Sequence, residues 1–128
     1  MTVEMKYELV ETGRTYSSGS TPVYRIRALK DFSDVKKGDL GGLVSGYHNL
    51  TQEGDAWIYD GAIAFGRSLV ADNAKVSGRV RIFDRALVID NAIIEGTRGG
   101  GIVFVSSKVT IKGDTHIYGV DSHNIKVG

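Results

Sequence analysis

The chain has 128 residues, with 16 lysines and arginines against 15 aspartates and glutamates, and a net charge of +1. This balance gives no general attraction to a long nucleic acid or to an anionic membrane, and no stretch is apolar for long enough to cross a bilayer. The absence of cysteine excludes disulfides, thiolate nucleophiles and cysteine-ligated metals, and is compatible with a cytoplasmic protein. The 17 glycines and single proline favour tight turns between short strands.

Residues 1–39 predict an N-terminal β-hairpin. The segments Lys6–Val10 and Val23–Leu29 alternate between polar and apolar residues, as half-buried strands do. Between them, the run from Gly13 to Pro22 is rich in serine, glycine and threonine and predicts a loop. We expect this hairpin to cover the N-terminal end of the segment that follows, because such caps hide an exposed sheet edge and core.

Residues 40–99 carry a repeat of six residues. One column is apolar from Ile58 onward: Leu40, Gly46, Gln52, Ile58, Ala64, Val70, Val76, Ile82, Val88 and Ile94. Two positions later, nine of ten residues are Gly or Asp: Gly42, His48, Gly54, Asp60, Gly66, Asp72, Gly78, Asp84, Asp90 and Gly96. Four positions later, most residues are small or aliphatic: Val44, Leu50, Ala56, Ala62, Ser68, Ala74, Val80, Ala86, Ala92 and Arg98. This period predicts a β-solenoid of short strands, with two inward columns and Gly or Asp at its corners.

Residues 100–128 predict a bulge loop, a last coil and a C-terminal cap. The repeat breaks after Gly96 and resumes in a new phase at Val105, with five residues more than one unit requires. A bulge of five residues explains this shift. The tail, Asp121 to Gly128, no longer follows the pattern, and we expect it to cap the stack.

The hexad Ile58-Tyr59-Asp60-Gly61-Ala62-Ile63 and its successors resemble the hexapeptide-repeat, left-handed parallel β-helix superfamily. The lead-in, from Tyr24–Phe32 through Gly38–Val44 to Gln52–Ile58, resembles small bacterial and bacteriophage members without a settled role. The resemblance implies an all-β, left-handed parallel β-helix of about eighteen residues per coil, assembled as a homotrimer or higher oligomer. Many relatives are acyltransferases that bind coenzyme A or a nucleotide-sugar between subunits. Those enzymes usually carry a catalytic histidine on a protruding loop.

With that coil length, one outward stripe combines aromatic, leucine and arginine columns. They are Tyr47, Phe65 and Phe83; Leu69 and Leu87; and Asn49, Arg67 and Arg85. One interpretation is a subunit interface, where aromatic residues and arginine are enriched. The other is a ligand site, in which aromatic faces stack on a nucleobase and arginines bind phosphate. The candidate ligand-binding residues are therefore Tyr47, Phe65, Arg67, Phe83 and Arg85.

Other columns favour structural roles. Asp55, Asn73 and Asn91 predict a hydrogen-bonded ladder, and Trp57, in a column with Lys75 and Ile93, is expected under the N-terminal cap. The three histidines, His48, His116 and His123, lack metal-ligand spacing, so no metal site is predicted. The run Gly99-Gly100-Gly101 is either a flexible bulge or an anion cradle.

Three functions stay open. The first is a non-enzymatic, homotrimeric binding protein that sequesters a small anionic, nucleotide-like signal in clefts between subunits, as a counter-defence sponge in the host bacterial cytoplasm if phage-encoded. The second is a protein-interaction or structural module, such as an inhibitor of a host protein or a virion part. The third is a hexapeptide-type acyltransferase with His116 or His123 as general base, ranked last because the chain is short and has no catalytic loop. No cofactor and no catalytic residue are predicted.

Overall fold

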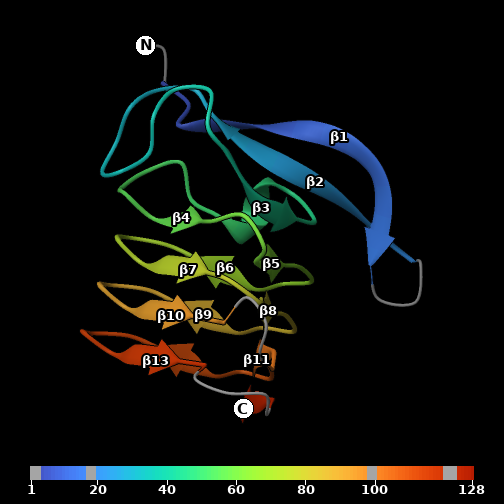
Figure 1. Cartoon of the computed structure of the whole chain (residues 1–128), viewed down its shortest axis with the longest axis vertical. Coiled ribbons are helices and arrows are strands. Elements are labelled where there is room, and N and C mark those ends of the chain that lie inside the picture. The colour runs from blue at the N-terminus through green and yellow to red at the C-terminus, as the bar shows by residue number, and fades with distance from the viewer. Residues whose placement is uncertain (1–3, 17–19, 98–100, 120–123) are drawn as a thin grey trace.

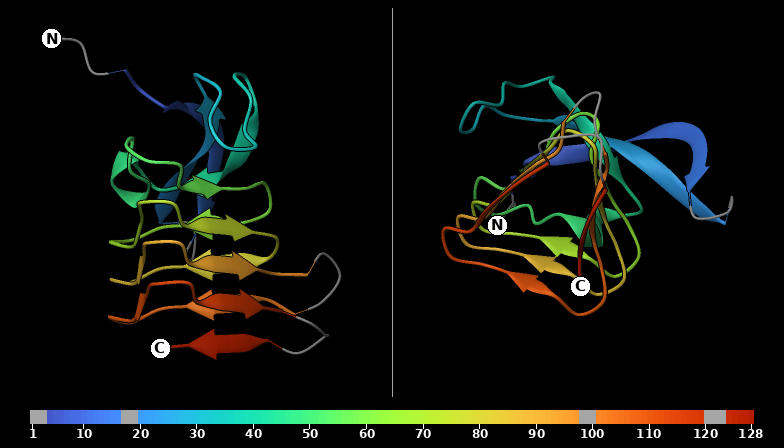
Figure 2. Two further views of the ribbon diagram at one scale, coloured as in Figure 1. Left: turned by 90° about the vertical axis from the view of Figure 1, so that its left-hand side faces the viewer. Right: turned by 60° about the horizontal axis from the view of Figure 1, so that its bottom comes forward.

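The computed structural model describes residues 4–16, 20–97, 101–119 and 124–128. They form a three-sided column of short parallel strands, with a long antiparallel hairpin at the N-terminal end (Figures 1 and 2). The 3₁₀ turn η1 (Tyr47–Asn49) is the one helical element among these residues. Within the same ranges, no helix has the length and apolar character needed to span a membrane. The predicted all-β parallel solenoid with an N-terminal hairpin is confirmed.

The hairpin consists of β1 (Tyr7–Tyr16) and β2 (Thr21–Ala28), which pair antiparallel. It is longer than the sequence predicted, because β1 continues through a polar stretch that has no alternation. A bulge interrupts the pairing between Glu11 and Arg14, where Gly13 has a φ of 69°. The Thr12 hydroxyl stabilises this bulge by donating to the carbonyl of Val23 at 2.6 Å.

Three sheets form the sides of the solenoid. The seven-stranded sheet has the order β1-β2-β3-β5-β8-β11-β14 and contains β3 (Leu40–Val44), β5 (Ile63–Ala64), β8 (Val80–Ile82), β11 (Val103–Val105) and β14 (Ile125–Val127). The four-stranded sheet contains β4 (Trp57–Ile58), β7 (Lys75–Ser77), β10 (Ile93–Glu95) and β13 (His116–Tyr118). The three-stranded sheet contains β6 (Leu69–Val70), β9 (Leu87–Val88) and β12 (Thr110–Ile111). Part of the predicted C-terminal cap is thus one more solenoid strand, β14.

The two inward columns build the core, as predicted. Ile58 pairs with Val76 in the next coil, Val76 pairs with Ile94 in the coil after that, and all three are fully buried. The column of small residues, which alternates with the aliphatic column along the chain, is also buried: Ala56, Ala62, Ser68, Ala74, Ala86 and Ala92. Small side chains there let the three sides approach one another closely, so the interior packs densely.

Glycine and aspartate make the corners for two reasons. They adopt the left-handed backbone region at a lower energetic cost than other residues, and Asp72, Asp84 and Asp90 have φ values of 60°, 57° and 58°. Each of these carboxylates also accepts a hydrogen bond from the corner amide of the next coil, as Asp90 Oδ2 does from Gly113 at 3.0 Å. Four predicted corner positions differ from the structure. Gly61 rather than Asp60 has the positive φ, of 97°, and Gly96 has no positive φ. Gly42 lies within β3, and His48 lies in η1.

The first coil does not keep the predicted phase. Val44 pairs with Ala64, and Leu50 with Val70, and in both pairs the partners lie two positions further apart in the sequence than the partners of later coils. The assignment of Leu40, Gly46 and Gln52 to the inward column is therefore wrong. The extra residues lie in the turn before Ala56, where Gln52 instead accepts hydrogen bonds from the backbone amides of Lys6 and Tyr7.

The last coil absorbs an insertion without losing register. Ile94 pairs with Ile117, and Val88 with Ile111, and both pairs are separated by five positions more than Val76 and Ile94 are. This is the five-residue excess that the change of phase predicts. Residues 98–100, which include Gly99 and Gly100 of the glycine run, lie outside the described residues.

A buried lysine and tyrosine close the N-terminal end of the column. The fully buried Lys6 donates from Nζ to the carbonyl of Ala56 at 2.7 Å, and the Tyr7 hydroxyl donates to the carbonyl of Leu50 at 2.6 Å. Trp57 is buried beneath them, 5.3 Å from the ring of Phe32 and 6.3 Å from that of Tyr7. The expected position of Trp57 under the cap is confirmed.

The corner aspartates lead to a stability prediction. Asp90→Ala removes a carboxylate acceptor and places alanine in the left-handed region, so we expect a loss of about 1–3 kcal/mol in the free energy of unfolding. Asp90→Asn keeps both an acceptor and a residue tolerant of this backbone, and should lose less than half as much. Urea denaturation of both variants checks this, and equal losses would contradict it.

Lys6 leads to a pH prediction. Burial lowers the pKa of Lys6 to about 8 from its ordinary value of 10.5, with the carboxylate of Asp55 opposing the change. Between these two values the unfolded chain holds the proton that the folded chain has released, so the free energy of unfolding rises with pH. We expect a gain of about 1–3 kcal/mol between these pH values, measured by urea denaturation. The gain should vanish in Lys6→Met and persist in Lys37→Met, which removes an exposed lysine.

Candidate functional site

A groove runs along the corner between the seven-stranded and three-stranded sheets. Its volume is about 850 Å³, and we call it the corner groove; its lining is Thr21, Phe65, Gly66, Arg67, Asp84, Arg85, Ser107 and Lys108. The left-handed residues Gly66, Asp84 and Ser107 turn the chain at this corner in three successive coils. The residue after each turn is a cation, so Arg67, Arg85 and Lys108 follow one another along the solenoid axis.

Backbone hydrogen bonds hold these cations in line. The Arg67 amide donates to the carbonyl of Asp84 at 2.8 Å, and the Arg85 amide donates to that of Ser107 at 3.0 Å. Adjacent strands are spaced by about 4.8 Å, which sets the interval between successive cation-bearing residues. Lys108 also belongs to this column. It lies one regular coil length plus five residues after Arg85, because the five-residue insertion falls between them.

The corner groove carries an excess of positive charge. Its three cations face one carboxylate, Asp84, whose Oδ2 already accepts a hydrogen bond from the amide of Ser107 at 3.0 Å. Within the described ranges, no ion pair involves Arg67, Arg85 or Lys108. All three residues are exposed, so the groove offers unpaired cationic groups to an anion.

Beside the groove lies an aromatic row, formed by Tyr16, Phe65, Phe83 and Phe104. The rings of Phe65 and Phe83 stack at 5.2 Å with an interplanar angle of 9°, as their column predicted. Tyr16, from the hairpin, packs at 4.9 Å against Phe65, and Phe104 packs edge-on at 6.5 Å against Phe83. No planar group fits between Phe65 and Phe83, because these two rings already contact each other.

The structure does not place Tyr47 in this row. Tyr47 lies in η1 and packs against Tyr7, with 5.6 Å between ring centroids. The greater length of the first coil moves it out of the predicted column. Asn49 is also displaced from the arginine column; it is buried and donates to the carbonyl of Ser68 at 2.8 Å. The sequence pattern does not identify five residues of this site: Tyr16, Thr21, Phe104, Ser107 and Lys108.

The asparagine column forms part of the expected ladder: Asn73 and Asn91 are joined, Asp114 extends the ladder, and within the described residues no hydrogen bond joins Asp55 to it. Asn73 donates to Asn91, and Asn91 donates to Asp114, both at 3.4 Å. Lys75, above this corner, donates to the hydroxyl of Ser33 at 2.9 Å and so ties the N-terminal cap to the second coil. These columns stabilise the solenoid through contacts within the chain.

Two of the three histidines lie in the described part of the chain, His48 in η1 and His116 in β13. His48 Nε2 is 2.7 Å from the carbonyl of Gly66, at the edge of the corner groove. His116 Nε2 is 3.5 Å from Glu95 Oε1 on the four-stranded sheet, and its ring lies 3.9 Å from that of Tyr118. His123 lies outside the described residues. Within those residues no three metal-ligating side chains come together.

One comparison with known proteins adds to this picture. No family model matches the chain. A protein of Escherichia coli strain K12, named "Uncharacterized acetyltransferase YdcK", is 33% identical to it over 99 residues, which are 72% of this chain and 30% of that protein. The chain thus spans less than a third of this relative. The six-residue repeat, the parallel solenoid and this similarity together support the hexapeptide-repeat β-helix superfamily.

Proposed function

We propose that this protein binds a small anionic ligand in the corner groove. The observation that carries the proposal is the column of Arg67, Arg85 and Lys108, one cation per coil, beside an apolar wall. Guanidinium groups bind phosphate oxygens through two parallel hydrogen bonds, and the lysine adds a point charge. Because successive coils supply the cations at a fixed spacing, the groove favours a ligand with several negative oxygens along the solenoid axis.

The aromatic row further limits the kinds of ligand that the groove accommodates. Phe65 and Phe83 stack on each other, so a planar group binds at the exposed edges of the row rather than between its rings. A nucleotide-like ligand has both the phosphate and the flat, partly apolar group that this arrangement accommodates. The cations of the corner groove supply binding groups for an anion, and binding without turnover is the form of function that we favour.

The same face is where we place contacts between subunits of a homotrimer. Leu69 and Leu87 point outward from the three-stranded sheet, pair with each other and are half-buried in the single chain. A neighbouring subunit on this apolar column would cover it and add a second wall to the corner groove. Bacteriophage origin and sequestration of a host signal stay predictions from the resemblance.

An acetyltransferase is the second candidate function. It is favoured by the name of the Escherichia coli relative and by the contact between His116 and Glu95, since a carboxylate can orient an imidazole as a general base. Coenzyme A, which carries a nucleotide and phosphates, also matches the chemistry of the corner groove. His116 lies on the four-stranded sheet, however, and the corner groove lies on another edge of the same chain.

Binding is tested with a panel of nucleotides, cyclic dinucleotides and coenzyme A by calorimetry, together with analysis of molecules released from the heated protein. Arg85→Ala should weaken binding of the best ligand by tenfold or more, about 1.5–3 kcal/mol, because it removes a charge-assisted contact. The mass of the assembly should not change in this variant. Lys112→Ala, at a different corner, should bind normally. The proposal would be contradicted if no probe bound and the heated protein released no ligand.

Turnover separates the two candidate functions. We expect no release of free coenzyme A when the protein is mixed with acetyl-coenzyme A and amine acceptors, measured with a thiol reagent. Release that falls by about 100-fold in His116→Ala, but not in His48→Ala, would establish the acetyltransferase instead. Binding that survives in both histidine variants without turnover supports the binding protein.

A further inference from the structure

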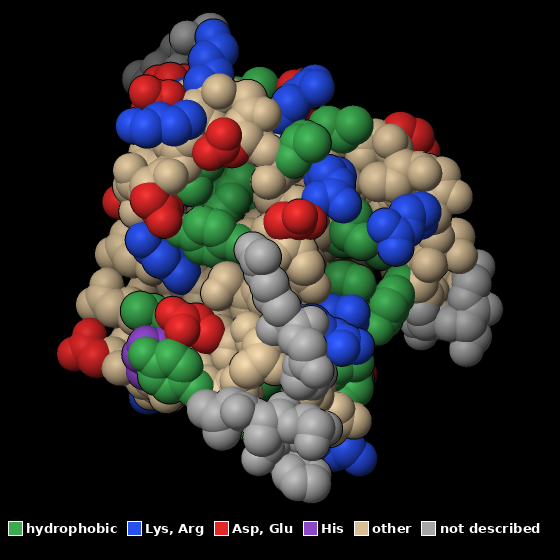
Figure 3. Space-filling model, in the orientation of Figure 1, with side chains coloured by type: hydrophobic (Ala, Val, Ile, Leu, Met, Phe, Trp, Pro, Cys, Tyr) green, Lys and Arg blue, Asp and Glu red, His purple; other side chains and the backbone are tan. Residues whose placement is uncertain are grey.

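We propose a second binding site, for a phosphate dianion, in the seam between the hairpin and the solenoid. A cavity of about 190 Å³ lies there, which we call the seam cavity; its lining is Arg14, Arg25, Leu43, Asp60, Gly61, Ala62, Ile63 and Arg81. Its three arginines come from three strands, β1, β2 and β8. Figure 3 shows basic and hydrophobic side chains next to one another where the hairpin meets the solenoid.

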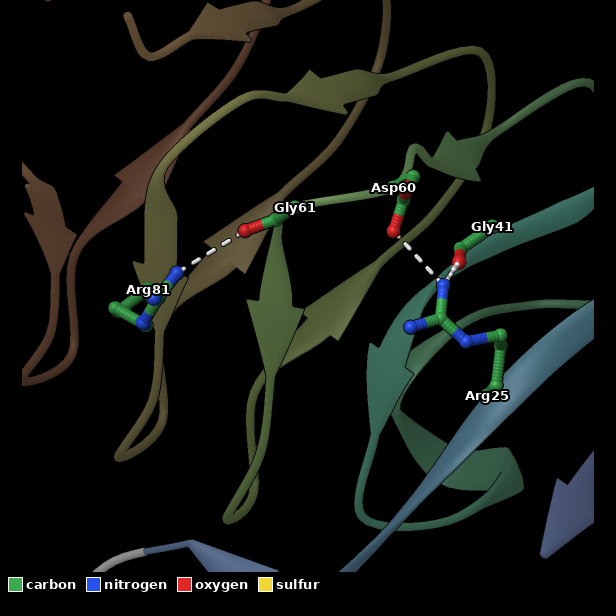
Figure 4. Close-up of polar contacts among 5 residues, drawn as sticks. All are labelled: Arg25, Gly41, Asp60, Gly61 and Arg81. Carbon is green, nitrogen blue, oxygen red and sulfur yellow. Dashed lines mark hydrogen bonds and ion pairs between the residues drawn. The ribbon is translucent and has the colours of Figure 1, made fainter. Parts of the chain in front are cut away.

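Arg25 is held with part of its guanidinium unused. Its Nη1 donates to the carbonyl of Gly41 and to Asp60 Oδ1, both at 2.8 Å (Figure 4). A guanidinium has five N–H groups, and neither Nε nor Nη2 of Arg25 donates to any described residue. The side chain is 26% exposed. The remaining donors are therefore fixed in place and accessible.

Arg81 is anchored in a similar way from the solenoid. Its Nε donates to the Tyr16 hydroxyl at 2.9 Å, and its Nη1 donates to the carbonyls of Gly61 and Val80 at 3.1 Å. Figure 4 shows Arg25 and Arg81 approaching the Asp60–Gly61 corner from opposite sides. The Nη2 of Arg81 makes no hydrogen bond to the described part of the chain. Because contacts within the chain already order both guanidinium groups, the two arginines lose little further side-chain entropy when an anion binds them.

The charge of the seam cavity sets the ligand class. Three guanidinium groups face one carboxylate, Asp60, which leaves an excess of two positive charges. The side chain of Asp60 is 76% exposed, so solvent screens its carboxylate, which only weakly offsets the positive charge of the cavity. A tetrahedral phosphate presents oxygens in several directions, which suits donors that arrive from three strands.

This site is separate from the corner groove, and its occupation has a mechanical effect. An anion in the seam cavity lies between Arg14 and Arg25, which belong to the hairpin, and Arg81, which belongs to the solenoid, and so links the two parts electrostatically. Apolar contacts already join these parts in a small cluster of Val23, Leu43 and Ile63. Since the hairpin also supplies Thr21 and Tyr16 to the surroundings of the corner groove, a bound anion steadies that wall.

The test uses inorganic phosphate and the complete chain at constant ionic strength. During the titration, ¹H–¹⁵N spectra follow the Nε–H signals of Arg25 and Arg81, which should shift and saturate in the millimolar range. Arg14→Gln changes an exposed residue and should weaken phosphate binding by about tenfold through loss of one cation. Arg25→Lys keeps the charge but not the free fork, and should weaken it similarly.

Two controls decide the interpretation. Arg27→Gln, on the same strand but paired with Glu8 outside the cavity, should leave the affinity unchanged. Arg85→Gln, in the corner groove, should leave the Arg25 and Arg81 shifts unchanged, so this test stands or falls independently of the proposed function. Acetate should bind more weakly because it carries one charge. Signals that move linearly without saturation, or equally in Arg14→Gln, would overturn the proposal.

Discussion

The structure depends on one constraint, the backbone hydrogen bonding between successive coils. Each short strand pairs in parallel with the strand one coil away, and two or three residues per strand suffice because three sheets share the stack. This pairing places equivalent positions of neighbouring coils above one another. Columns of like residues follow from it: the aliphatic core, the corner aspartates, the asparagine ladder, and the cations of the corner groove.

The same constraint explains which features could be predicted from the sequence. Between Ala56 and Gly96 the coil length is constant, so simple counting placed Phe65 over Phe83 and Arg67 beside Arg85. The repeat does not predict the position of Tyr47 because two additional residues precede Ala56, in a turn where Gln52 accepts hydrogen bonds from the amides of Lys6 and Tyr7. Lys108 can be predicted from the sequence, because one coil length plus the five-residue change of phase leads from Arg85 to Lys108.

Other parts of the site had no sequence signal at all. Tyr16 reaches Phe65 only because the hairpin is long and curves over the seven-stranded sheet, and the polar residues that lengthen it do not alternate (Figure 2). The guanidinium of Arg81 depends on this approach, since its Nε donates to the Tyr16 hydroxyl. β1 is two strands away from β3 and three from β5 in the seven-stranded sheet, so its contact with Phe65 depends on the curvature of the strands, and residue spacing does not encode that curvature.

The insertion in the last coil has a consequence for protein engineering. Pairing resumes between Ile94 and Ile117 as if the additional residues were absent, so the hydrogen-bond ladder tolerates a change in the number of residues between two paired strands. An insertion point of this kind is suitable for grafting a foreign peptide, because the neighbouring strands keep their hydrogen-bond partners. The coil that carries the graft then sets the position of the foreign peptide along the solenoid axis.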